Sequence, residues 1–487
     1  MNSPYPETTR RCERWRHRAN PLAWLLTAIF VTSVAACSTP TYEPQEVEPT
    51  FELPEDWHHE VEEGEEFDHN WCTDFGDPRL GEILEIVYTH NLDIRIARSR
   101  IDEARALLAQ NRSRRYPSID LQAEAEVERS PDGWEPSFEI SAPAAYEVDL
   151  WGRISSELSA DEIDLEALGA ELFALKMVLA TETAEQYYEL ARIRTELRLL
   201  DDQLEVAETF LELTKVRHAQ GIASAIDVVQ QEQQIEELHE SRRSAELAEE
   251  LTLHALATLM GQPPGFTQAP FARRLPEKPP PVADFIPADL LERRPDVAAS
   301  RMRVTAANHR LDAALKEQLP RLIIGSELAL RATSPGELLD FLFASVVGTI
   351  IQPLWDGGRV QGRVDEEAAV MQRHLLEFSS VLLTAIREVE DTLARGQAIY
   401  EILEIQRRQL EAAEEALELA QDHYRAGMLD YLRVLTALQS IQQLQSAELD
   451  SRRALLSQRI QLCRVAGGDW PARGDDSDDD QQEKEDR

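Results

Sequence analysis

The sequence contains few cysteines, and their spacing excludes the common cysteine-based sites. Cysteine occurs at only four of the 487 positions, namely Cys12, Cys37, Cys72 and Cys463. The sequence has no CxxC pair and no cysteine–histidine cluster with zinc spacing, which excludes a recognisable structural zinc or redox motif. Cys72 and Cys463 lie too far apart in the chain for a disulfide to be deduced, and a buried thiol is the simplest interpretation of each.

Basic residues and the usual catalytic motifs are also scarce. The chain has 90 Asp and Glu against 50 Lys and Arg, and its net charge of −40 argues against a nucleic-acid partner. It has no glycine-rich phosphate loop, no HExxH and no nucleophile elbow. Its histidines are scattered, and His58, His59 and His69 lie in an acidic segment that we interpret as a solvated linker. We therefore predict no enzyme, no catalytic residue, no metal and no cofactor.

The apolar run near the N-terminus is too short for a comfortable membrane span. Residues 21–36 follow a basic region and have the proportions of a signal peptide. The run ends in Val34-Ala35-Ala36-Cys37-Ser38, which resembles a bacterial lipobox and implies lipidation at Cys37 after removal of residues 1–36. The resemblance also implies the outer membrane, because Ser38 follows the cysteine where an Asp would favour inner-membrane retention. An ordinary signal peptide and a signal anchor are the alternatives.

The rest of the chain contains the same unit twice, about 205 residues apart. Trp151-Gly152-Arg153 corresponds to Trp355-Asp356-Gly357-Gly358-Arg359, and a glycine that breaks a helix recurs as Gly221 and Gly427. This spacing is too long for a solenoid repeat and predicts a duplicated helical domain. The predicted domains after the signal are an acidic tether and lead-in segment (37–90), a first repeat (91–264), a Pro-rich linker (265–288), a second repeat (289–468) and an acidic disordered tail (469–487).

Long helices dominate each repeat. Residues 91–114 predict an amphipathic helix with Leu92, Ile96 and Leu107 on one face. Residues 151–219 and 359–426 predict helices about 100 Å long, and each returns as a second helix after Gly221 or Gly427, the expected hairpin tips. Coiled-coil seams are predicted at Leu197, Leu200, Leu204, Ala207, Leu211 and Thr214, and at Ile386, Val389, Leu393, Gly396, Tyr400 and Leu403.

Two strand candidates precede the long helix of each repeat. Residues 118–128 and 137–150 alternate apolar with polar residues, whereas residues 321–330 and 343–354 alternate less strictly. Pro143 should interrupt its strand. The alternation fits either a membrane β-barrel or a half-buried soluble hairpin. Four strands cannot close a barrel, so a membrane location requires an oligomer. The predicted pore-lining carboxylates are Glu124, Glu126, Glu128, Glu139, Glu147 and Asp149.

The ordered motifs of both repeats, together with the lipobox, resemble the TolC-type outer-membrane efflux channel family, in its NodT-like lipoprotein branch. The resemblance extends from about Trp71 to Trp470. It is carried by the segments at residues 71–80, 91–95, 146–153, 221–228, 291–297, 353–359 and 424–432.

The resemblance implies a mainly α fold with a membrane β-barrel. In this fold three chains each give four strands to a twelve-stranded barrel, and their coiled-coil hairpins form a periplasmic tunnel. It also implies that the protein passively conducts substrates supplied by a proton-driven or ATP-driven inner-membrane pump through a periplasmic adaptor. A type I protein secretion duct of the same fold and a lipid-anchored coiled-coil scaffold are the alternatives.

The resemblance also implies a periplasmic gate at the second hairpin tip. Leu432 matches a leucine that forms an apolar constriction, whereas the family's usual Asp four residues later is Thr436 here. A usual Arg beyond it is Gln439, and the family's second Trp is Cys72. Leu432 could instead be an ordinary coiled-coil core residue.

Overall fold

The computed structural model describes residues 47–51, 77–131, 133–265, 271, 275, 294–338 and 342–465. The chain divides into two compact units. One holds residues 117–153 and 312–363, and the other holds the remaining described residues. The expectations for Cys37, Cys72, the signal segment and the acidic tail lie outside the described residues.

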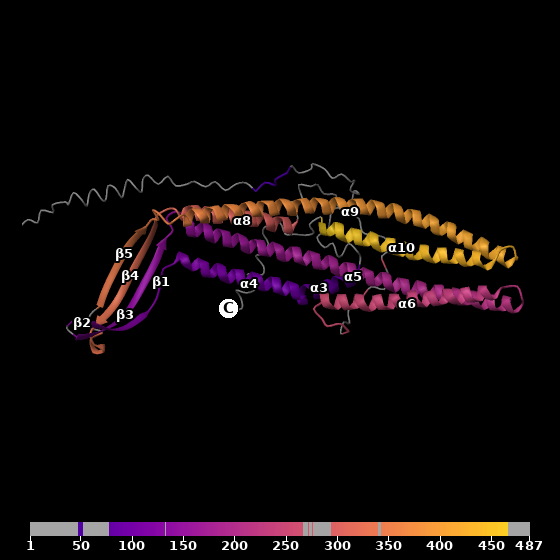
Figure 1. Cartoon of the computed structure of the whole chain (residues 1–487), viewed down its shortest axis with the longest axis horizontal. Coiled ribbons are helices and arrows are strands. Elements are labelled where there is room, and N and C mark those ends of the chain that lie inside the picture. Colours follow the sequence, from indigo (N-terminus) through magenta and orange to yellow (C-terminus); the bar gives the residue numbers. More distant parts are fainter. Residues whose placement is uncertain are drawn as a thin grey trace, which may run out of the picture. The chain divides into compact units, whose positions relative to one another are not determined.

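The first unit contains one antiparallel sheet (Figure 1). Its strands are β1 (Ser118–Ile119), β2 (Gln122–Ser130), β3 (Gly133–Val148), β4 (Arg321–Ala332) and β5 (Leu342–Ile351). The order is β1-β3-β4-β5, and β2 also pairs with β3. In the described sheet, β5 therefore forms one edge, and β1 with β2 forms the other.

β1 and β2 form a single line of strand that Pro143 interrupts. Ile119 lies opposite Ala144 and Gln122 opposite Ser141, so both strands keep the same register against β3. Between them, the amide of Asp120 donates to the carbonyl of Pro143 at 3.0 Å, but Pro143 has no N–H to return. β3 itself continues through Pro143, so the prediction that Pro143 interrupts its own strand is wrong. The missing N–H instead separates β1 from β2 in the neighbouring line. We call residues 118–130 the β1/β2 line.

The register gives the sheet two chemically different faces. On one face, Ile140 pairs with Ala123 of β2 and with Leu330 of β4, and Leu330 pairs with Leu342 of β5. We call this the apolar face. On the other, Glu139 pairs with Glu124 and with Arg331. We call this the acidic face. Because side chains alternate along a strand, the pairings assign every strand residue to one of the two faces.

The helices confirm the duplication. The long helices α5 (Arg153–Ala219) and α9 (Arg359–Arg425) each have 67 residues, and the returning helices α6 (Ala225–Leu259) and α10 (Tyr431–Val465) each have 35. Figure 1 shows α5 beside α6 and α9 beside α10. None of the described helices combines the length and apolar composition needed to cross a membrane. The remaining helices are α3 (Pro78–His90), α4 (Leu92–Arg112), α8 (Pro295–Lys316) and the short η1 (Ser113–Arg115) and η2 (Pro335–Glu337).

The two hairpin turns depend on glycine in the left-handed region. Gly221 has φ 75° and Gly427 has φ 74°. In each turn the residue after the glycine donates back across the helix end, as Ile222 does to the carbonyl of Arg217 at 2.9 Å. A side chain at either glycine would strain the turn, so both hairpin tips follow from the sequence as predicted.

A short helix, α3, lies within the segment 37–90, for which the sequence analysis predicted a tether and lead-in without a helix. Asp77 caps it and Pro78 begins it, and its apolar residues Leu80, Ile83 and Val87 are fully buried. They pack in a core with Tyr187 of α5 and with Cys463, which is buried. The lead-in is therefore a folded element as far as the structure describes it.

Several boundaries and faces differ from the predictions. β3 begins earlier than residue 137, and β5 ends at Ile351 rather than at residue 354. On α4, Leu92 and Ile96 are exposed, as is Leu107, whereas Ile94 and Leu108 are buried. The first coiled-coil seam is confirmed, because its apolar residues pack in one cluster with residues of α6, and Thr214 is buried as well. The second is confirmed in part, since Tyr400 is 57% exposed.

Candidate functional site

The predicted pore-lining carboxylates lie together on the acidic face. Glu124 of β2 lies directly opposite Glu139 of β3, and Glu126 lies opposite Ser137. Glu128 lies opposite Glu135, a carboxylate that the sequence analysis did not include. Glu147 shares this face further along β3, and Asp149 follows the end of the strand. The register thus collects negative charge on one side of the sheet.

Two arginines moderate this negative charge. The Arg331 guanidinium on β4 lies 2.9 Å from the Glu139 carboxylate and 3.7 Å from that of Glu327. Arg153, at the start of α5, lies 2.8 Å from Glu147. The sequence analysis missed Arg331, because its partner belongs to the other repeat and only the β3–β4 pairing brings them together. Ion-paired Glu139 and Glu147 therefore add less to the field of the face than Glu124, Glu126 and Glu128.

The predicted gate residues lie on the surface of α10. Leu432 is 51% exposed, which contradicts the alternative of an ordinary core residue within this chain. Thr436 is exposed one turn later, and its hydroxyl donates to the Leu432 carbonyl at 2.8 Å. That hydrogen bond occupies the hydroxyl within its own helix, so the layer after Leu432 carries an apolar methyl and a neutral oxygen.

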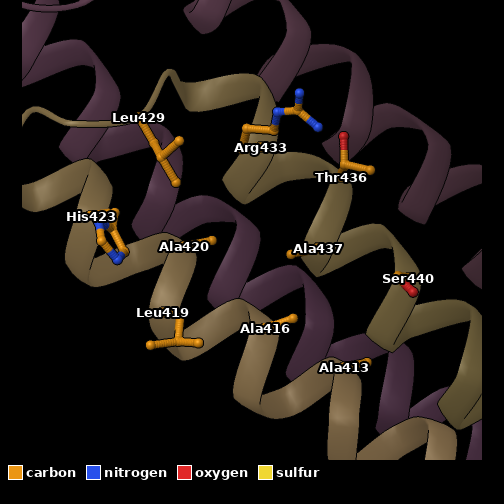
Figure 2. A pocket seen from close by; sticks show the side chains of 10 residues that line it. All are labelled: Ala413, Ala416, Leu419, Ala420, His423, Leu429, Arg433, Thr436, Ala437 and Ser440. Carbon is orange, nitrogen blue, oxygen red and sulfur yellow. The ribbon is translucent and has the colours of Figure 1, made fainter.

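A shallow groove of about 470 Å³ runs beside these residues between α9 and α10 (Figure 2). Alanine side chains make up much of its lining, and His423 and Arg433 are its basic residues. Thr436 also lines this groove. The lining residues are Ala413, Ala416, Leu419, Ala420, His423, Leu429, Arg433, Thr436, Ala437 and Ser440.

Glutamine side chains connect the first hairpin to the second by hydrogen bonds. Gln234 of α6 donates to Gln442 of α10 at 3.1 Å and accepts from Gln439. Gln203 of α5 donates to Gln445 at 3.1 Å. The residue that replaces the family's usual Arg, Gln439, is thus half-buried in an inter-hairpin contact.

A tyrosine completes this contact near the tips. The hydroxyl of Tyr431 donates to the side-chain oxygen of Gln231, whose amide donates to the Ala207 carbonyl at 2.8 Å. Burial raises the pKa of Tyr431 above its ordinary value, so the hydroxyl stays protonated as a donor. The ring lies 5.7 Å from that of Tyr424, which Arg217 of the first hairpin covers at 4.3 Å. These contacts join the two repeats.

Within the described residues, no group of three or more His, Cys, Asp or Glu side chains is placed to hold a metal ion. What the structure does provide is a sheet with one apolar and one acidic face, together with paired coiled-coil hairpins. This combination is the one expected of a channel-forming protein, because the apolar face suits lipid and the acidic face suits water.

The comparisons identify the kind of channel. The family model for outer membrane efflux proteins matches residues 84–262 and 286–468, so the chain belongs to that family. Pyoverdine export outer membrane protein OpmQ of Pseudomonas putida is 26% identical over 90% of this chain and 96% of its own. Solvent efflux pump outer membrane protein SrpC of Pseudomonas putida is 28% identical over 81% of this chain and 86% of its own.

Solved structures agree in fold. The outer-membrane channel OprN has a TM-score of 0.80 at 24% identity, covering 88% of this chain and 99% of its own. VceC of Vibrio cholerae has a TM-score of 0.76 at 25% identity, covering 82% of this chain and 99% of its own. The expected efflux-channel fold and function are therefore confirmed: this is an outer-membrane efflux channel. The family and these neighbours are channels rather than enzymes.

Proposed function

We propose that three copies of the chain form the outer-membrane duct of a tripartite exporter. The observation that carries the proposal is the sheet, whose acidic face requires water while its apolar face suits lipid. The described sheet has two open edges, which cannot remain unpaired in a bilayer. Three copies supply enough strands for a closed barrel, with the acidic faces lining the pore.

The cargo we propose is small molecules rather than polypeptides. The relatives named above are called pyoverdine and solvent exporters, and others are named for toluene efflux. The channel itself adds no chemistry, so an inner-membrane pump, driven by protons or ATP, would supply the energy. A periplasmic adaptor would join the pump to the hairpin tips.

Exposed apolar residues at the tips support adaptor docking there. Ile222 and Ile226 beside the first turn are 60% and 67% exposed, and Met428 beside the second is 64% exposed. Apolar side chains gathered at a loop commonly mark a protein contact. We expect Ile222→Glu combined with Ile226→Glu to abolish export while the conductance of the purified channel stays unchanged. A double variant that still exports normally would contradict adaptor docking at the first tip.

Lipidation at Cys37 would anchor the same protein to the outer membrane. The lipobox supports this proposal. Cys37→Ala should block acyl-chain labelling and leave the precursor uncleaved. Normal amounts of mature protein from that variant would contradict it.

The stoichiometry and the pore are tested together. Native mass spectrometry of the purified full-length protein should give the mass of three chains, and the same preparation should insert conducting channels into planar bilayers. A monomer that conducts, or a trimer that never conducts, would contradict the proposed function.

A further inference from the structure

A tryptophan fastens the first repeat to the second within the sheet unit. The indole Nε1 of Trp151, just after β3, donates to the carbonyl of Pro320, just before β4, at 2.8 Å. Lys316 lies 3.5 Å from the neighbouring carbonyl of Gly152. The end of one strand is thereby tied to the start of the next strand in the β3–β4 pair.

The equivalent tryptophan of the second repeat is exposed. Trp355, which follows β5, is 90% exposed, and Leu354 beside it is 92% exposed. Pro320 directly precedes the first strand of the second repeat, β4, and its counterpart in the first repeat is Pro117, which directly precedes β1 and is exposed. Within one chain, β5 and the β1/β2 line are opposite edges of the sheet, so Trp355 has no route to its own Pro117.

We propose that Trp355 donates its indole N–H to the Pro117 carbonyl of a neighbouring copy, and that β5 pairs with that copy's β1/β2 line in the register that β3 keeps with β4. The inference rests on the proposed oligomer and specifies how its subunits join. Each repeat then has the same surroundings, and the exposed indole acquires the partner that its counterpart Trp151 already has.

The register follows from the two landmarks of the repeat. Within the chain, Ser141 of β3 lies opposite Ala329 of β4. Aligning Trp151 with Trp355 converts Ser141 into Ser345, and aligning Pro320 with Pro117 converts Ala329 into Glu126. Ser345 of one copy therefore lies opposite Glu126 of the next. Aligning the helix starts Arg153 and Arg359 instead would place Ser345 opposite Glu128, which provides a rival register.

The two faces of the sheet also support the proposed register. In the proposed register Val346 lies opposite Ala125 and Ile350 opposite Leu121, so apolar residues continue across the junction. Ser345 and Glu126 continue the acidic face. A slip by one residue would put the carboxylates of the β1/β2 line on the lipid side of the neighbouring sheet, away from the water that the acidic face provides.

Cysteine crosslinking tests the register. In full-length protein carrying Cys72→Ser and Cys463→Ala, the pair Ser345→Cys with Glu126→Cys should form disulfide-linked trimers on oxidation. The matched pair Ser345→Cys with Glu128→Cys should crosslink several-fold less, because diagonal neighbours are too far apart for unstrained disulfide geometry. Stronger crosslinking of the Glu128 pair would overturn the register. Intact trimers that crosslink with neither pair would overturn the pairing of β5 with the β1/β2 line, and the proposed function would still stand.

The tryptophan contact has its own test. Trp355→Phe keeps an aromatic ring but removes the donor, so its trimers should dissociate at a lower temperature in detergent than wild-type trimers. Trp151→Phe removes the equivalent bond inside one chain and should leave trimer dissociation closer to wild type. Equal dissociation temperatures for wild type and Trp355→Phe would overturn the contact. Monomers in wild type would contradict the proposed oligomer itself.

Discussion

At the scale of single residues, Leu432 is the residue that we expect to form the gate. Its exposure on α10 leaves an apolar side chain without a partner in its own chain. If three copies meet on an axis, they form an apolar constriction that excludes water. Leu432→Ala should therefore raise the resting conductance of reconstituted channels. Unchanged conductance with a less stable trimer would show that Leu432 packs between subunits without gating.

Because Thr436 stands one turn after Leu432, we predict that the channel binds no cation at that level. The Thr436 hydroxyl is bonded to the Leu432 carbonyl and carries no charge. Thr436→Asp would bring three carboxylates close together, where they repel one another and attract cations. We expect millimolar divalent cations to reduce the conductance of this variant and not of the wild type. Thr436→Asn, which has the same shape without the charge, is the control, and equal block of both variants would contradict the explanation.

Arg331 should set how strongly the channel prefers cations. It pairs with Glu139 on the acidic face, so its removal leaves that carboxylate and Glu327 uncompensated. Arg331→Gln should increase the cation-to-anion permeability ratio by about twofold or more, since charged rings select ions by sign. Arg129→Gln, on the apolar face, is the control and should leave the ratio unchanged. A lower ratio in Arg331→Gln would place Arg331 outside the pore.

At the scale of elements, an ion-pair cluster holds the start of α8 against α9. Arg294 is buried, and its guanidinium contacts Asp296 at 3.0 Å and Glu388 of α9 at 3.0 Å. Burial raises the pKa of Asp296, but the hydrogen bonds and charge of Arg294 and the amide of Val297 outweigh it, so the pKa lies below its ordinary value. Asp296 therefore stabilises the fold only when ionised.

This cluster predicts a pH dependence. A lowered folded-state pKa gives stability that is complete above the unfolded pKa of about 4 and is lost as the pH falls through the folded value. Asp296→Asn should cost about 1 kcal/mol at neutral pH, a figure reduced for the partial exposure of the carboxyl. The difference from wild type in thermal unfolding should shrink toward pH 3. A difference that is constant from pH 7 to pH 3 would show that charge is not its cause.

The long helices and their turns could be predicted from sequence because their signals are local. The tip glycines mark both turns, the seam from Leu197 to Thr214 specifies a packed face, and Pro143 marks a break in the ladder. By contrast, α3 was missed because it is a short helix in the lead-in segment, and it is its packing against α5 that buries its apolar residues. The wrong face of α4 was chosen because its apolar residues point in several directions, and packing partners decide which are buried.

The contacts between repeats could not be predicted, because they depend on register between segments far apart in the chain. Arg331 meets Glu139 only after β3 pairs with β4. Gln439 meets Gln234 only after the two hairpins pack. The common face of the predicted carboxylates could be predicted, since alternation along β2 and β3 assigns them to one face without knowledge of any partner.

At the scale of the whole molecule, a single chain is structurally incomplete. A single chain supplies a sheet with two open edges, an exposed Trp355 and an exposed Leu432. The proposed trimer gives each of these features a partner. It also places the acidic faces of three sheets around one pore, where their uncompensated carboxylates act together on passing ions.

The reversal potential of the purified channel in a planar bilayer, measured under a gradient of potassium chloride, shows directly whether the acidic faces line the pore. A pore lined by the acidic faces should give a potential of the sign that marks cation preference. A potential that marks anion preference at neutral pH would contradict the account, because the acidic face would then not line the pore.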